Sequence, residues 1–388
     1  MDKIFQYLPD INLGYYKNID KIYVLGDIHG DLNKFLSFLK SINIIKSFKY
    51  PKDYNAYNRS FNQITNDVNE YITFNNNYLA KLKNICIIQL GDITDGHLSC
   101  SRFGHDYINN DIGIYAVIDT IIKKFKKLKN NCHFVLIIGN HDIENIFNII
   151  GYDNKSKYVY CSDDNLVDDN MLYNSWGNYS LNSNEVLITN KSKKEKLTLN
   201  KLQKRNEYLT NHFDIFHNIY FIVQINDKVF SHTVLYKYVL DKLEKHIQYI
   251  NNYNIIDCLN AMLKYCMMKL TKKVLTSKKE IEDLLDDSFI IQQLFNMVST
   301  RSKDDLSLIN EDDMIYFNDV HHYFVGHEVQ DEINKIKHSM FDLYIYYIDI
   351  GISKSLYNIN TKTKYYYVII NELNNKLQKC NDIKCVSI

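Results

Sequence analysis

Three short polar motifs, each directly behind an apolar stretch, constrain the fold of this chain more than any other feature. They read GDIHG at residues 26–30, GDITD at 91–95 and GNHD at 139–142. The stretches before them, short and rich in β-branched residues, are residues 21–25, 85–90 and 134–138. Such apolar stretches are typical of strands in a sheet that is covered on both faces. Since the intervals are long enough for helices, the pattern predicts an α/β fold with polar groups at the carboxyl ends of the strands.

The motifs also predict local geometry. A glycine precedes the leading Asp or Asn of each motif, at Gly26, Gly91 and Gly139. We expect the strand to turn sharply there, so that the next side chain can reach back over the strand end. Asp27 and His29 are two residues apart, and side chains alternate in extended backbone, so both are expected to point to the same side.

Carboxylate, imidazole and amide side chains at one sheet edge are typical of a site for two divalent cations. Two such cations about 3.5–4 Å apart need a bridging carboxylate, further oxygen and imidazole ligands, and open positions for water and substrate. We expect Asp92 to be the bridging ligand. Its motif follows the second of the three strand-like stretches.

Two later motifs complete the pattern, SHT at 231–233 and GHE at 326–328, again behind strand-like residues. With all five in order, the chain resembles the calcineurin-like metallophosphoesterases, whose motif set is GDxHG, GDxxDRG, GNH[ED], a later single His and GHxx. The ordered match runs from about residue 21 to residue 353. Three details resemble bacterial-type and Shewanella-like protein phosphatases more than the animal Ser/Thr phosphatases: GDIHGDL, Asn145 after GNHD, and YIDIG at 347–351.

The resemblance implies a fold and a ligand set. The fold would be a four-layer α/β/β/α sandwich of two mixed sheets with a helical insertion, with the metals at the strand ends. The ligands of the first metal would be Asp27, His29 and Asp92, and those of the second would be Asp92, Asn140, His232 and His327. Two divalent ions are the expected cofactor, with manganese first and iron or zinc as alternatives. If His232 and His327 were each considered without the other motifs, a structural role would be the safer interpretation.

The resemblance also implies catalytic roles. His141 would face the substrate and act as the general acid that protonates the leaving oxygen, and Asp95 would orient it. A neighbouring carboxylate raises the pKa of a histidine, which such an acid needs near neutral pH. The nucleophile would be a metal-bridging hydroxide that attacks phosphorus in line, so no side-chain nucleophile is required.

One departure from the family pattern concerns the residues that bind phosphate. Gly96 stands where the second motif usually carries arginine, and the chain has only four arginines. Arg301, between the fourth and fifth motifs, is the best candidate for a catalytic phosphate ligand. Arg102 is a second substrate-binding candidate, although a solvated loop arginine is an equally good interpretation of it. Asn140 would also contact the substrate.

The amino-acid composition disfavours two classes of binding partner, nucleic acid and membrane surfaces. Acidic and basic residues balance at 46 each, so no net field attracts nucleic acid or a membrane surface. The lysine-rich residues 123–129 close a predicted helix, where cations complement the helix dipole, and a solvated helix end is favoured over an anion-binding patch. The N-terminus does not resemble a signal peptide and no stretch approaches about 18 apolar residues, so we expect a cytoplasmic protein.

We expect one phosphoesterase domain over residues 1–388, since 46% apolar residues in 388 can bury a large core. Three segments are interpreted as insertions into this domain. They are an Asn/Tyr-rich insertion at 48–80, a loop-rich insertion at 151–210 and a helical cap or insertion at 236–300. Other expected elements are helices at 32–39 and 107–129, a hairpin of 220–225 with 228–231, and closing strands at 365–371 and 383–388.

The expected activity is hydrolysis of phosphomonoesters, with a Ser/Thr protein phosphatase ahead of a phosphotyrosine phosphatase. GHE lacks the second histidine that many phosphodiesterases carry, which favours a monoesterase. The expected substrate is a phosphoprotein or a phosphorylated small molecule. Alternatives are a dinucleoside polyphosphate hydrolase, a nuclease, which the neutral charge disfavours, and a metal-binding scaffold without catalysis.

Overall fold

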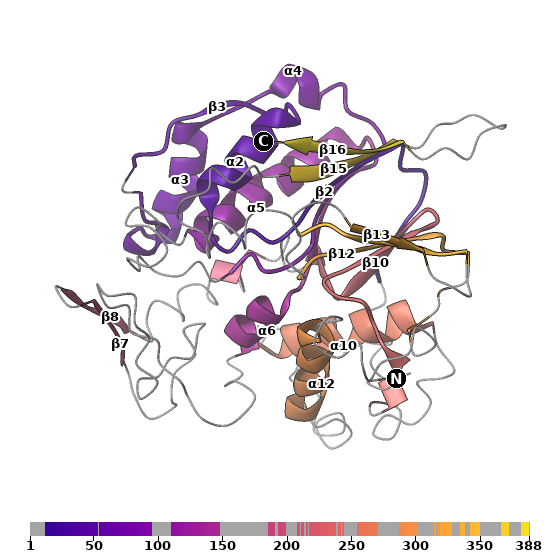
Figure 1. The fold of residues 1–388 in the computed structure, drawn as a ribbon. Coiled ribbons are helices and arrows are strands. Elements are labelled where there is room, and N and C mark those ends of the chain that lie inside the picture. Colours follow the sequence, from indigo (N-terminus) through magenta and orange to yellow (C-terminus); the bar gives the residue numbers. More distant parts are fainter. Residues whose placement is uncertain are drawn as a thin grey trace.

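Two six-stranded mixed sheets packed face to face form the centre of the computed structural model, with helices outside them (Figure 1). The structure describes residues 12–52, 54–94, 110–147, 185–190, 193–198, 208–209, 211–212, 215, 217–237, 240–241, 243, 254–270, 287–300, 314–315, 317, 319–327, 334–337, 342–349, 366–371 and 382–387. The predicted fold class, helices around two mixed sheets, is confirmed.

The first sheet has the order β16-β15-β2-β5-β6-β9. Its strands are β2 (Lys21–Leu25), β5 (Ile85–Gln89), β6 (Cys132–Ile137), β9 (Ile219–Tyr220), β15 (Tyr366–Asn371) and β16 (Asp382–Ser387). β2, β5, β6 and β9 run parallel, and β15 joins β2 in the antiparallel direction. The carboxyl ends of β2, β5 and β6 therefore lie at one edge.

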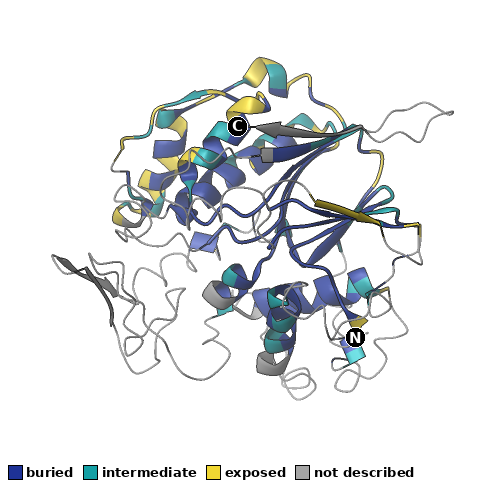
Figure 2. Ribbon diagram, viewed as in Figure 1, coloured by how far each residue is buried: buried dark blue, intermediate teal, exposed yellow. Residues whose placement is uncertain are grey.

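The second sheet has the order β1-β10-β11-β12-β14-β13. Its strands are β1 (Tyr15–Tyr16), β10 (Ile222–Ile225), β11 (Lys228–Ser231), β12 (His322–Val325), β13 (Asn334–Lys337) and β14 (Tyr344–Tyr347). β10 and β11 form the predicted hairpin, and β11, β12 and β14 run parallel. β13 is exposed along its whole length at the edge of this sheet (Figure 2).

Alternation along the strands divides the core into two layers. Ile22 and Val24 of β2 join the apolar cluster between the sheets, while Tyr23 and Leu25 join the cluster beneath the helices. In the inter-sheet layer, the rings of Phe230 and Phe324 stack with centroids 4.9 Å apart, and Phe324 stacks on Tyr346 at 4.6 Å. Both faces of the strands are therefore buried, which explains their nearly continuous apolar runs.

The helices lie in two groups on opposite sides of the sheets (Figure 1). Those beside the first sheet are α2 (Leu32–Ser41), α3 (Phe61–Tyr71), α4 (Asn76–Leu79) and α5 (Asp111–Leu128). Those in the other group are α6 (Asn140–Phe147), α10 (Ile255–Leu270) and α12 (Asp287–Ser299). α10 packs on β9 and β10, and α12 packs on α6 and α10. Among the helices of the described ranges, none is long and apolar enough to cross a bilayer.

Two of the segments that the sequence marked as insertions contain further regular structure. The Asn/Tyr-rich segment holds the 3-10 turn η1 (Ala56–Asn58), α3, β4 (Ile72–Phe74) and α4. β4 pairs antiparallel with β3 (Ile45–Phe48), which ends where the segment begins. Ser60 and Gln63 form a capping box that fixes the start of α3. Within the loop-rich segment, β7 (Glu185–Asn190) and β8 (Lys193–Thr198) form an antiparallel pair.

The chain crosses between the sheets at Phe221, where the sequence predicted one continuous strand. Asn260 of α10 supports this crossing: its Oδ1 accepts from the backbone N–H groups of Phe221 and Ile222 at 2.7 and 3.3 Å. Its Nδ2 donates to the carbonyls of Leu13 and Ile222 at 2.8 and 2.6 Å. One turn later, Lys264 donates to the His217 carbonyl at 2.8 Å and lies over the Tyr220 ring. A crossing strand loses ladder partners, and α10 replaces them.

Replacing Asn260 with Leu should therefore lower the free energy of unfolding by about 2–4 kcal/mol, because several buried backbone groups lose their partner. Urea unfolding measures the loss. Asn33→Ala, at an exposed position of α2, is the matched control and should change stability by less than about 0.5 kcal/mol. Equal stability of the Asn260→Leu protein and the control would contradict the role of Asn260.

Candidate metal centre

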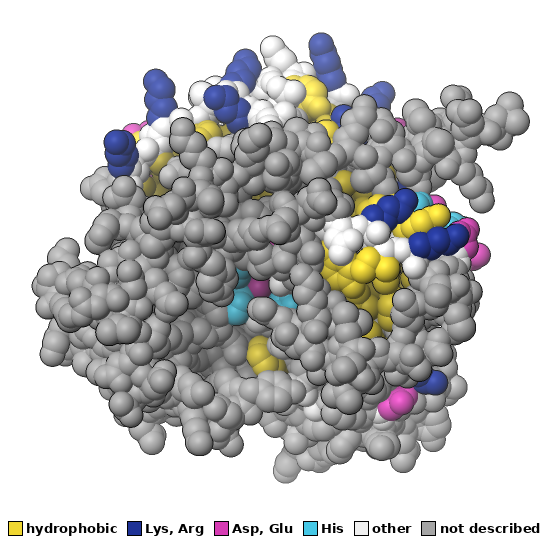
Figure 3. All heavy atoms as spheres, viewed as in Figure 1, with side chains coloured by type: hydrophobic (Ala, Val, Ile, Leu, Met, Phe, Trp, Pro, Cys, Tyr) yellow, Lys and Arg dark blue, Asp and Glu magenta, His cyan; other side chains and the backbone are white. Residues whose placement is uncertain are grey.

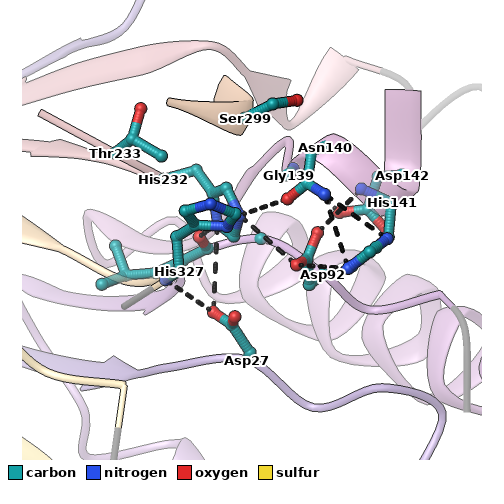
Figure 4. A network of polar contacts seen from close by, with 12 residues as sticks. Asp27, Asp92, Gly139, Asn140, His141, Asp142, His232, Thr233, Ser299 and His327 are labelled. Atoms are coloured by element: carbon teal, nitrogen blue, oxygen red, sulfur yellow. Dashed lines mark hydrogen bonds and ion pairs between the residues drawn. The ribbon is translucent and has the colours of Figure 1, made fainter. Parts of the chain in front are cut away.

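Polar side chains from five strand ends converge at one edge of the two sheets (Figure 4). They follow β2, β5, β6, β11 and β12, and they are Asp27, Asp92, Asn140, His232 and His327. All are less than 9% exposed. In the space-filling view, histidine and acidic side chains lie at the base of a hollow on this face (Figure 3). The first three motifs thus meet as expected from parallel strands of one sheet, and the fourth and fifth, which follow strands of the second sheet, join them as the family resemblance implied.

Asp92 lies at the centre of the cluster. Its Oδ2 is 3.4 Å from Nε2 of His232 and 3.6 Å from Nε2 of His141, and its Oδ1 accepts from the His141 backbone N–H at 3.0 Å. Two groups of potential metal ligands share it: His29, Asp92 and His141, and Asp92, His232 and His327. Within each group the ligand atoms lie within 4.8 Å of one another. Asp92 is therefore placed to contact two ions.

The second group is ordered by its own hydrogen bonds. Nδ1 of His232 lies 2.7 Å from the Leu90 carbonyl, to which it can only donate. In the neutral ring Nε2 then carries the lone pair, and it lies 3.1 Å from Oδ1 of Asn140 and 3.1 Å from Nδ1 of His327. Since Oδ1 can only accept, Nε2 and Oδ1 are two electron-pair donors that face each other, as two ligands of one cation would. A histidine whose other nitrogen is fixed by a carbonyl is the usual arrangement of a metal ligand.

The first group differs from the sequence expectation in two respects, because it contains His141 and does not contain Asp27. Nε2 of His29 lies 4.0 Å from Oδ2 of Asp27, and Oδ1 of Asp27 accepts from the His327 backbone N–H at 3.4 Å. His141, which was expected to face away from the metals, lies beside His29 with ring centroids 5.4 Å apart. The geometry therefore permits His141 to reach either a metal or the substrate.

Carboxylates are crowded in this centre. Burial, and then the charges of Asp349 and Asp92, raise the pKa of Asp27 well above its ordinary value. Burial also acts to raise the pKa of Asp92, but His141 and His232 outweigh it and lower the pKa. Buried acids so close together are costly unless cations compensate them. Oxygen and imidazole donors suit manganese, iron or zinc, so the residues fit the two divalent ions that the motifs imply.

The two histidines beside the Asp92 carboxylate have pKa values shifted in opposite directions. Burial lowers the pKa of His141 well below its ordinary value, and the nearby Asp92 only partly offsets this effect. The expectation of a raised pKa rested on Asp95, which lies outside the described residues. For His232 burial again acts to lower the pKa, but Asp92 and the Leu90 carbonyl raise it above the ordinary value.

Three residues of the centre have left-handed backbone, namely His29, Asp92 and His327, with φ of 49°, 53° and 61°. Such values are uncommon outside glycine and cluster at functional sites. Asp27 and His29 are therefore brought together by a left-handed turn, and the expectation of extended backbone was wrong. The Asp92 carbonyl holds this turn, because it accepts from the backbone N–H groups of Ile28 and His29 at 3.1 and 2.8 Å.

The glycines of the motifs have two different roles. Gly91 has φ of 104°, as the expected sharp turn requires. Gly139 has no such backbone; a Cβ there would collide with the carboxylate of Asp92. The expectation of a glycine turn is therefore right for the second motif, while the third needs glycine for close packing.

Asp142 connects the second and third motifs. Its carboxylate accepts from Thr94 N and Oγ1 at 2.9 and 3.0 Å and from Gly139 N at 3.0 Å. The sequence showed it only as the last residue of the GNHD motif. Gln89 was missed altogether, although it stands out as a polar residue within an otherwise apolar strand. Of the remaining candidates, Asp95, Arg102 and Arg301 lie outside the described residues.

The pKa of Asp142 gives a pH prediction. Burial and the charge of Asp92 raise this pKa from 3.8 to about 6. The folded protein therefore binds a proton more tightly at Asp142 than the unfolded chain does, and the resulting stability is lost as pH rises through about 6. In chelator-treated protein, the unfolding free energy of the parent minus that of Asp142→Asn should fall from about pH 4 to about pH 6 and then level off.

Urea unfolding of both proteins across this range measures the difference, in which the contributions of titrating groups distant from Asp142 cancel. A difference that rises with pH, or does not change, would contradict the raised pKa of Asp142.

Two of three comparisons with known proteins gave matches. Residues 20–331 match the family model described as calcineurin-like phosphoesterase. A solved structure of a cold-active protein tyrosine phosphatase is similar at 15% identity and a TM-score of 0.42, covering 96% of this chain and 80% of that chain. The cold-active protein-tyrosine phosphatase of a psychrophilic Shewanella species has 16% identity and a TM-score of 0.40, covering 94% and 79%. A search of curated proteins gave no match.

Proposed function

We propose that this chain, which belongs to the calcineurin-like phosphoesterases and is therefore a metal-dependent hydrolase of phosphoesters, removes phosphate from phosphoserine or phosphothreonine in proteins. One observation carries the dinuclear chemistry: Asp92 is shared by two groups of potential ligands. The preference for monoesters is supported by the sequence after His327, where Glu328 and Val329 leave no second histidine.

In this proposal the protein residues hold two ions and move one proton. Asp27 and His29 would bind one ion, Asn140, His232 and His327 the other, and Asp92 both. The bound ions supply a nucleophile at neutral pH and stabilise the charge that develops on the phosphoryl oxygens. His141 would donate its proton to the leaving oxygen; because burial lowers its pKa, this role requires Asp95, or the charge of the bound phosphoryl group, to keep the ring protonated.

Phosphate recognition is assigned by sequence position. Gly96 cannot supply a donor from its side chain, so another group must meet the equatorial oxygens of phosphate. We propose Arg301 for this task, because a guanidinium presents a fork of donors that matches two phosphate oxygens. Arg102, in the loop after the second motif, is the alternative.

The function is tested with manganese-loaded protein on four substrates: a phosphoseryl peptide, the matching phosphotyrosyl peptide, a diadenosine polyphosphate and a phosphate bis-ester. We expect the phosphoseryl peptide to have the highest kcat/KM. The Asp92→Asn protein is the control for contaminating phosphatases. Faster turnover of the diadenosine polyphosphate or the bis-ester would contradict the proposal, and turnover of none of the four would favour a metal-binding scaffold.

Metal analysis tests the ligand roles. Asp92→Asn should lower the occupancy of both metal sites, because this carboxylate is proposed to bind both ions, whereas His327→Ala should mainly empty one. Half-buried His321 offers a control, and His321→Ala should keep the stoichiometry of the parent. A stoichiometry near two for the Asp92→Asn protein would rule out the bridging role.

The proton donor is tested through the leaving group. His141→Asn should keep the metal content and lose on the order of 10²- to 10⁴-fold in kcat. The loss should be larger for an alkyl phosphate, whose leaving oxygen needs the proton, than for an activated aryl phosphate, which can leave as an anion. Steady-state kinetics on both esters measures the contrast. Equal losses together with lost metal would make His141 a ligand.

A further inference from the structure

Gln89 is an unusual residue for its position. It is the last residue of β5, in the middle of the first sheet, and its side chain is fully buried. The four residues before it in the strand are buried and apolar. A polar side chain in such a strand is unfavourable unless its hydrogen bonds are satisfied, so its partners indicate what it does.

The partners of Gln89 are the backbones of the first two motifs. Its Nε2 donates to the Gly26 carbonyl at 3.3 Å and also to the Gly91 carbonyl, and its Oε1 accepts from the Gly91 N–H at 3.1 Å. Leu25 of β2 lies opposite Gln89 in the parallel register, so both strands end here. One carboxamide thus links the residue before Asp27 to the residue before Asp92.

These contacts act on the part of the backbone that orients Asp92. Gly91 has a left-handed φ of 104°, and a Cβ on it would collide with His232 and with the backbone of Gly139. The Asp92 carbonyl in turn accepts from the N–H of His29. Without Gln89, the two turns would still be joined by the bond from the Leu90 N–H to the Leu25 carbonyl before the glycines and by the bonds to the Asp92 carbonyl after them. The Gly26 and Gly91 carbonyls between these bonds would lose the carboxamide that links them.

We propose that Gln89 is a positioning residue that sets the separation of the Asp27 and Asp92 carboxylates and thereby the affinity for the pair of metal ions. This inference rests on the metal-ligand roles proposed above. The carboxamide provides two donors and an acceptor at once, which no apolar side chain of similar size can do. Groups that orient the ligands of a metal typically change its affinity by 10- to 100-fold when removed.

The test compares Gln89→Leu with Gln224→Leu, a control in β10 whose side chain donates to the Asn226 carbonyl, away from the centre. Manganese is titrated into each metal-free protein by calorimetry, and the electron paramagnetic resonance spectrum of the loaded protein reports the exchange coupling of the two ions. We expect Gln89→Leu to weaken manganese binding at least tenfold and to alter or abolish the coupled signal. Gln224→Leu should retain the affinity and the signal of the parent.

If Gln89→Leu does not fold, Gln89→Met, closer in shape to glutamine, takes its place in both measurements. Parent-like affinity and an unchanged coupled signal in the folded variant, with only a lower melting temperature, would show that Gln89 merely fills and satisfies the core. In that case the parent still binds two ions and the proposed function stands. A parent protein that binds none of manganese, iron and zinc would overturn the proposed function as well as the role of Gln89.

Discussion

The buried carboxylate of Asp92 is the constraint on which the rest of this centre depends. It lies within 3.4–3.6 Å of two imidazole nitrogens, and its own backbone is left-handed. A buried carboxylate is unfavourable, and so is a left-handed backbone at a residue other than glycine. Asp92 combines both. Neighbouring histidines offset part of this cost, and bound cations would offset the rest.

The polar groups around the centre form hydrogen bonds with the backbone of the motif turns rather than with solvent. Asp142 joins the second motif to the third, and Gln89 joins the first to the second. Asn110, at the start of α5, donates its backbone N–H to the Gly30 carbonyl, and its side chain holds the backbone of Tyr54 and Ala56. The Asn/Tyr-rich segment is thereby tied to the first motif. Such supporting contacts give a site the rigidity that catalysis by positioned charge requires.

Much of the fold could be predicted from the sequence because its signals are local. β2 spans the expected residues, and β5 and β6 differ from expectation by one or two residues at their ends. The convergence of Asp27, Asp92 and Asn140 followed from the rule that parallel strands of one sheet end at one edge. His232 follows a strand of the second sheet, and only the family resemblance placed it at this centre. What failed depended on tertiary contacts. The change of sheet at Phe221 needs Asn260, which lies 39 residues away in the sequence. The left-handed turn at His29 needs the carbonyl of Asp92.

The sequence predicts the positions of the site residues better than it predicts their chemical roles. His141 follows Asn140, and by motif it should face the substrate, yet it packs against Asp92 and His29. Its low pKa results from burial, which no motif encodes. Gln89 could have been found, because a lone polar residue in an apolar strand is a local signal.

Anomalous scattering from crystals of the manganese-loaded protein would test the central claim most directly. The account predicts two manganese positions about 3.5–4 Å apart, both in contact with the carboxylate of Asp92. A single position, or two positions of which only one contacts Asp92, would contradict it.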